Sequence, residues 1–182
     1  MTMGTLTITI DDHALLVEID GRPVRSVPVG PLTLLAGPLR GGDPPLPADL
    51  TNALGLVHDH LDDLLIEEPS IATAHDVVAL GRHADAMGRV EIGADHVPDG
   101  YELLRADADE VFRTLAVEPL ADRRHNPGLP KAHVESIVAT CCVILAIMRR
   151  LDLHAVQIGA GGSDAEQRDA DEHNSDERTA TR

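Results

Sequence analysis

The chain has 182 residues, which is enough for one domain with a sizeable core, and its formal net charge at pH 7 is −16. A surface this acidic repels phosphate backbones and therefore argues against nucleic acid as a partner. Tyr101 and Phe112 are the only aromatic residues. The core must therefore consist of aliphatic side chains that pack against one another.

Three antiparallel strands are predicted at the start of the chain. Apolar residues occupy every second position in residues 6–10 and 15–19, which is typical of strands with one buried face. Asp20-Gly21 indicates the tight turn of a hairpin, and Val24–Val29 is the third strand. Pro31–Leu35 is then expected to form a short helix.

The middle of the chain is predicted to alternate between loops and short elements. The stretch 37–47 is rich in glycine and proline, so we expect a loop. From Pro47, leucine and valine recur every three or four positions, which predicts an amphipathic helix that ends near Leu65. The remaining expectations for this region are a short buried strand at Ser70–Thr73, a helix at His75–Leu80 and a loop at Gly88–Gly100.

The last part of the ordered chain is predicted to be mainly helical. We expect helices at Asp107–Leu115, Pro119–Arg124 and Lys131–Leu151, followed by a strand at Leu153–Ile158. The apolar run in the third of these helices is too short to span a bilayer and indicates a buried core helix. Residues 159–182 contain no apolar side chain larger than alanine, so they are predicted to be a disordered acidic tail.

The start of the chain and its two cysteines indicate a cytoplasmic protein. Met1-Thr2-Met3-Gly4 has neither the basic region nor the apolar run of a signal peptide. Cys141 and Cys142 are adjacent within an apolar helix, so they cannot join distant segments. We interpret them as two small buried hydrophobic residues.

The order of the predicted elements, β-β-β-α-β-α-β, is that of an RNase H-like core. Such a core extends three antiparallel strands by parallel strands, which are reached through right-handed helical crossovers. The predicted fold class is therefore an α/β half-domain of the RNase H-like and actin-like (ASKHA) type, with helices on both faces of the sheet.

Several short stretches occur in an informative order. They are Asp20-Gly21 with Ser26-Val27-Pro28-Val29-Gly30, Gly42-Asp43-Pro44-Pro45, Gly100-Tyr101-Glu102-Leu103, Arg123-Arg124 with Pro127-Gly128-Leu129, and Ile137-Val138-Ala139. Together they resemble the second half of the exopolyphosphatase and guanosine-pentaphosphate phosphatase (Ppx/GppA) family. The resemblance implies that residues 1–158 form the carboxy-terminal half-domain of a two-half architecture. The other half, which carries the family's expected catalytic glutamate, has no counterpart in the chain.

The resemblance also places the family's phosphate loops on this sequence. The first hairpin turn of the family carries a pattern close to Asp-Ile-Gly-Gly-Gly-Ser-Thr-Glu, whose bare glycines let backbone N–H groups approach phosphate. That pattern falls on Ile8 to Leu15, where acidic and bulky side chains replace the glycines. A second phosphate loop of the family falls on Ile71–Ala74, and two further family positions fall on the last helix. The implied phosphate-loop remnants are Asp11, Asp12, His13, Thr73, Glu135 and Thr140.

Two functions follow from this comparison. Phosphoryl transfer depends on positioning and charge stabilisation, so the altered loops favour a catalytically degenerate module that binds or regulates a partner, with no catalytic residue assigned. The alternative is an exopolyphosphatase or guanosine pentaphosphate phosphohydrolase with a site rebuilt from Asp11, Asp12 and His13, which would need Mg or Mn. A weaker third hypothesis is a nucleotide sensor without cleavage.

Metal binding is considered at two places. His58 and Asp62 lie one helical turn apart and could share a cation, but a solvated face of an amphipathic helix explains them more simply. Asp11 and His13 could chelate a cation, but an ordinary polar turn is again the simpler explanation. No cofactor is therefore predicted unless the enzyme alternative holds.

Self-association is the expected interaction. A half-domain without its neighbour leaves a partly apolar face, which favours a two-fold homodimer or a protein partner. A phosphate-containing ligand is disfavoured by the altered loops, and neither nucleic acid nor a membrane is expected as a partner.

Overall fold

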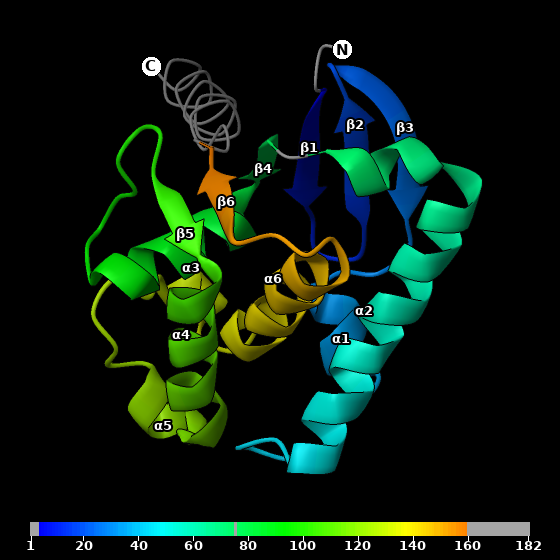
Figure 1. Ribbon diagram of the computed structural model, residues 1–182. Coiled ribbons are helices and arrows are strands. Elements are labelled where there is room, and N and C mark those ends of the chain that lie inside the picture. The colour runs from blue at the N-terminus through cyan, green and yellow to red at the C-terminus, as the bar shows by residue number, and fades with distance from the viewer. Residues whose placement is uncertain (1–3, 75, 160–182) are drawn as a thin grey trace, which may run out of the picture.

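A mixed six-stranded sheet forms the centre of the computed structural model, which describes residues 4–74 and 76–159. The strand order is β3-β2-β1-β4-β6-β5 (Figure 1). The first three strands are antiparallel, β4 and β6 extend the sheet in parallel with β1, and β5 is antiparallel to β6. The bounds are Thr5–Ile10 (β1), Leu15–Ile19 (β2), Arg22–Val27 (β3), Asp76–Leu80 (β4), Glu102–Leu104 (β5) and Ala155–Ile158 (β6).

Helix α6 (Ile137–Arg150) is the central helix of the fold. Every residue from Ile137 to Met148 is buried, and the helix contacts α1, α2, α3 and α4 (Figure 1). Their bounds are Pro31–Ala36 (α1), Pro47–Glu67 (α2), Arg82–Ile92 (α3) and Arg105–Val117 (α4). The shorter elements are α5 (Leu120–Arg123) and the 3-10 helices η1 (Pro69–Thr73) and η2 (Lys131–His133). This arrangement confirms the predicted half-domain of the RNase H-like and actin-like type.

The sheet buries one of its two faces. In β1, Leu6, Ile8 and Ile10 are buried, and the alternate positions of β4 and β6 follow the same pattern. The intervening residues face the other side and are exposed, as in Thr5 and Gln157, or partly exposed, as in Thr7. Among the described residues the helices therefore cover one face of the sheet, whereas helices were expected on both. The physical reason is visible in β1, where threonines alternate with the buried apolar residues rather than the strand being apolar throughout.

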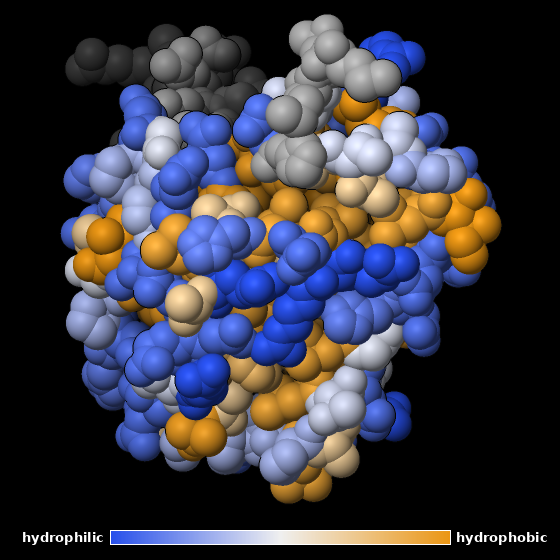
Figure 2. Space-filling model, viewed as in Figure 1, coloured by the Kyte–Doolittle hydropathy of each residue, from blue (hydrophilic) through white to orange (hydrophobic). Residues whose placement is uncertain are grey.

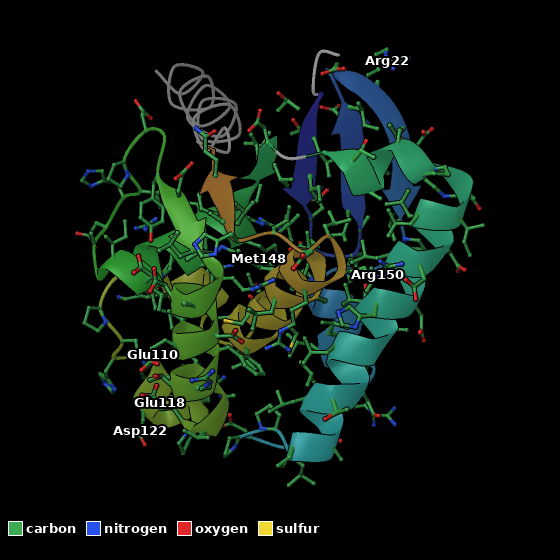
Figure 3. The ribbon with its side chains drawn as sticks, viewed as in Figure 1. Arg22, Glu110, Glu118, Asp122, Met148 and Arg150 are labelled. Carbon is green, nitrogen blue, oxygen red and sulfur yellow. The ribbon has the colours of Figure 1, made fainter. Side chains whose placement is uncertain are left out.

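The C-terminal end of α6 is fixed by ion pairs on the surface. Arg149 pairs with Asp109 of α4 at 2.5 Å, and Arg150 pairs with Asp62 of α2. Figure 3 shows Arg150 beside α2, and in Figure 2 strongly hydrophilic side chains form a band across this part of the molecule. The pairs connect the central helix to its neighbours without contributing to the core.

Two predicted elements around residue 75 are wrong. Ser70–Thr73 was expected to be a strand but belongs to the 3-10 helix η1. His75–Leu80 was expected to be a helix, but Asp76–Leu80 is strand β4, and His75 itself lies outside the described residues. Val77 and Ala79 are the buried pair of this strand. Five residues are too few to separate a short strand from a helical turn by periodicity.

Three further predictions need correction. The expected loop at Gly88–Gly100 begins inside helix α3, where Gly88 lies against Val97 so closely that an added Cβ would be 2.9 Å from its Cγ2. Gly88, the first residue of the expected loop, is therefore a packing position of a helix. Strand β5 was not predicted, and the expected long helix from residue 131 is divided into η2 and α6.

Two predictions remain, one on the C-terminal tail and one on membrane spans. Beyond Gly159, the predicted disordered tail lies outside the part that the structure describes. Among the described residues, no helix has the length and apolar character that a membrane span requires.

Candidate functional site

Three segments that are distant in sequence meet at one end of the sheet. They are the turn between β1 and β2, the start of α3 directly after β4, and the N-terminal part of α6. Gly81 makes the approach between the first two possible because its φ is +97° and a Cβ there would lie 2.8 Å from the carbonyl oxygen of Ile10. Only glycine adopts this conformation at so short a distance without strain.

A hydrogen-bond network joins one side chain from each segment. His83 of α3 places Nε2 2.8 Å from Oδ1 of Asp12 and Nδ1 3.1 Å from Oγ1 of Thr140. Arg82 donates from Nη2 to the other Asp12 oxygen, Oδ2, at 2.5 Å. We refer to Asp12, Arg82, His83 and Thr140 as the Asp12 cluster. Both oxygens of its carboxylate therefore have a donor within the chain.

The protonation states of the cluster follow from burial and hydrogen bonding. The hydrogen bond from His83 is the main reason that the pKa of Asp12 is lowered, so its carboxylate is ionised at neutral pH. Burial is the main reason that the pKa of His83 is lowered, so the imidazole is neutral. A neutral ring between these partners carries its proton on Nε2, donates it to Asp12, and accepts the Thr140 hydroxyl proton at Nδ1.

A second histidine completes one wall of the site. The rings of His133 and His83 are edge to face, with centroids 4.8 Å apart. Burial is the main cause that lowers the pKa of His133 to about 4, so it is also neutral at pH 7. Both rings face a hollow of about 230 Å³, which is lined by Asp12, Leu32, Arg82, His83, Ala132, His133, Glu135 and Ser136.

The order carboxylate, imidazole, hydroxyl has the form of a nucleophilic triad, but its burial argues against that use. Thr140 is 0% exposed, so its hydroxyl has no access to a substrate. A nucleophile has to reach the reacting atom. Thr140 therefore orients His83 rather than attacking a bound molecule.

The backbone of the β1–β2 turn is held by hydrogen bonds and by close packing. The amide of Asp11 donates to the carbonyl of Ala14 at 2.9 Å, and the carbonyl of Asp12 accepts from Leu32 at 2.8 Å. Gly30 lies so close to this turn that an added Cβ would be 2.5 Å from the Asp11 carbonyl oxygen. The turn is therefore packed against the segment that follows β3.

The structure brings some of the predicted site residues together and separates others. Asp12 and Thr140 belong to the Asp12 cluster, and Glu135 lines the same hollow. Asp11 and His13 are exposed positions of the turn. Thr73 lies in η1, before β4, so it is not in the loop that follows the fourth strand.

The sequence analysis missed the two histidines and Arg82. The misassigned fourth strand explains why Arg82 and His83 were missed, because the loop after β4 begins at Gly81 rather than at Ile71. The signal that would have found these two residues is the Gly81-Arg82-His83-Ala84 segment directly after the apolar Val77–Leu80 run.

The candidate metal ligands do not form a cluster. Among residues 4–74 and 76–159, no three His, Cys, Asp or Glu side chains are grouped so that they could hold a metal ion. Asp62 is engaged by Arg150 (Figure 3). Asp11, His13 and His58 therefore belong to no such group of three in the described part of the chain.

Comparison with known proteins identifies the fold. No protein-family model and no curated protein matches the chain. Solved structures do match. An exopolyphosphatase-like protein superposes with a TM-score of 0.78 at 14% identity, over 86% of this chain and 54% of that one. The Aquifex aeolicus Ppx/GppA family member gives 0.74 at 14% identity, over 87% and 53%. An exopolyphosphatase from Cytophaga hutchinsonii gives 0.68 at 16% identity, over 86% and 53%.

These matches define the class of fold. The chain has the architecture of one half-domain of the Ppx/GppA structures and spans about half the length of the proteins it matches. Because the identities are 14–16%, the likeness shows the fold, and it agrees with the family resemblance indicated by the sequence. Which of the two halves the chain corresponds to stays a prediction.

Proposed function

We propose that the chain is a catalytically degenerate Ppx/GppA-like half-domain that acts as a binding or regulatory module. The observation that supports this is the position of the Asp12 carboxylate. Arg82 and His83 are the donors that could receive an anion in the hollow, and both donate to Asp12 at 2.5 and 2.8 Å. We infer that the Asp12 carboxylate takes the position that a phosphate oxygen would need in order to reach these two donors.

The electrostatics of this arrangement disfavour a second anion. The carboxylate is ionised at neutral pH, so an incoming phosphate would meet a negative charge at contact distance. Neither histidine is protonated to compensate for it. Phosphoryl transfer needs positive charge and open donors around the transferred group, and the one guanidinium of this site is already paired with Asp12.

The test is an assay of phosphate release from polyphosphate and guanosine pentaphosphate with Mg²⁺ or Mn²⁺. We expect no turnover above the buffer blank. The enzyme alternative draws on one observation, the hollow of about 230 Å³ that has Arg82, His83, His133 and Ser136 on its walls. Turnover that disappears in both Asp12→Asn and His83→Gln would establish the hydrolase and remove the degenerate module.

Self-association is the second part of the proposal. The chain covers only 53–54% of the matched structures, so the surface that would meet the other half lacks that neighbour within the chain. A second copy that covers it would give a two-fold dimer. Light scattering on the purified protein at tens of micromolar is expected to give twice the monomer mass, and a strict monomer would contradict the dimer.

A further inference from the structure

We propose that a hollow between α5 and η2 binds a small organic anion, recognised by Lys131 and Arg124. The hollow has a volume of about 730 Å³ and is lined by Leu120, Arg124, His125, Lys131, Ala132, Val134 and Glu135. Pockets for small molecules have volumes of roughly 300–1,000 Å³. We call it the basic hollow. The basic hollow is separate from the Asp12 cluster. Binding of a ligand there would be a further property of the protein, in addition to the function proposed above.

The basic hollow brings two cations of an acidic chain to one place. The net charge is −16, and Lys131 is the only lysine. Most arginines of the described residues have a carboxylate within 4.0 Å, namely Arg25, Arg82, Arg89, Arg105, Arg123, Arg149 and Arg150. Neither Arg124 nor Lys131 has one among residues 4–74 and 76–159. Two cations that stay unpaired beside His125, in so acidic a protein, provide an attractive field for an anion.

The walls of the basic hollow are held in place by a buried arginine. Arg123 is 3% exposed and donates from Nη2 to the Glu118 carbonyl at 2.7 Å and to Asp43 Oδ1 at 3.1 Å. Its Nη1 lies 3.5 Å from the Val134 carbonyl oxygen. The other Asp43 oxygen accepts from the Leu120 amide at 2.6 Å. Glu118 is labelled in Figure 3, at the end of α4 beside α5. One guanidinium therefore connects both sides of the hollow, and a preformed site loses little entropy on binding.

The remaining lining residues indicate the chemistry of the ligand. Leu120, Ala132 and Val134 provide apolar surface, and Glu135 places one negative charge on the wall. A polyanion without an apolar part would gain no contact with the three apolar side chains and would be repelled by the Glu135 carboxylate. The ligand class that fits is a compound with a single acidic group and an apolar body.

The probe for this proposal is 8-anilinonaphthalene-1-sulfonate, which has one sulfonate on an aromatic body and fluoresces when it enters an apolar site. We expect saturable binding with one site per chain. N-phenyl-1-naphthylamine has the same body without the charge, and we expect it to bind at least about fivefold more weakly, because a charge-assisted contact is lost. Sodium chloride should weaken only the sulfonate probe.

Variants assign the signal to the basic hollow. Lys131→Gln and Arg124→Gln each remove one charge from an exposed side chain, and each should weaken the sulfonate probe about three- to tenfold. Arg113→Gln is the matched control, since Arg113 is exposed on α4 and does not line the hollow. Equal affinity in all three variants, equal affinity of the two probes, or no saturable binding would each overturn the proposal. Because no readout involves phosphate release, its failure would leave the proposed function untouched.

Discussion

The Asp12 cluster and the basic hollow are adjacent but use their cations in opposite ways. In the cluster, Arg82 and His83 are engaged by an aspartate of the same chain. In the basic hollow, Lys131 and Arg124 have no such partner among the described residues. Ala132 and Glu135 line both places, so a single turn of chain before α6 separates them. We therefore expect the partners of the basic residues near a hollow, rather than their number, to decide whether an anion binds there.

The largest effect that tests this comparison is expected from Arg123→Ala. Removing a buried guanidinium leaves carbonyl groups of Leu115 and Glu118 without their donor. We expect the free energy of unfolding to fall by about 2–4 kcal/mol, measured by urea denaturation. Arg124→Ala changes an exposed neighbouring residue and should alter the free energy of unfolding by less than about 0.5 kcal/mol. Similar effects of both variants would show that Arg123 does not hold the walls of the basic hollow.

The next effect concerns pH and His133. Its pKa is about 4 in the folded chain and near 6.5 when unfolded, so the unfolded state binds more protons between these values. The contribution of His133 is therefore fully present above pH 6.5 and is lost as the pH falls toward 4. Between pH 6.5 and 4, the free energy of unfolding should fall by up to about 3 kcal/mol less in His133→Gln than in the wild type. A decline of unchanged slope would contradict the neutral, buried imidazole.

A smaller effect is expected from Asp12→Ala. The variant leaves the Nε2–H of His83 without an acceptor, which should lower the free energy of unfolding by about 1–2 kcal/mol. Because the pKa of Asp12 is lowered in the folded chain, this contribution is present above pH 3.8 and is lost below it. Asp11→Ala is the control at an exposed position of the same turn. A loss of equal size in both variants would argue against the cluster.

The smallest effect is expected from Arg150→Ala. Its pair with Asp62 is on the surface, with the two side chains 40% and 50% exposed. We expect a change in unfolding free energy of less than about 1 kcal/mol, which diminishes further in high salt. If the free energy of unfolding fell as much as in Arg123→Ala, the difference in burial between these two arginines would not explain their contributions to stability.

The sequence predicted the fold class well because its strongest signals are long or strictly periodic. The alternation in β1 and β2 and the three-to-four spacing in α2 identified those elements, and an apolar run located α6. Short elements were misread. The residues of β4 are too few for a period. The loop expected from Gly88 begins inside α3, where the missing side chain of Gly88 allows Val97 to pack against the helix.

The site was predicted only in part, and the reason is spatial. Asp12 and Thr140 were reached through the resemblance, whereas His83 depended on a correct β4. His133 carries no local signal, because its importance comes from burial against His83. The engagement of Asp12 by two donors is a tertiary contact over about seventy residues, which no local pattern encodes.

The most direct test of the central claim is an isothermal titration of inorganic phosphate into the wild-type chain and into Asp12→Ala. If the Asp12 carboxylate holds the donors of the site, the wild type gives no heat of binding, and the variant, whose Arg82 and His83 are released, binds phosphate in the millimolar range. Phosphate binding to the wild type with an affinity equal to that of the variant would contradict the account.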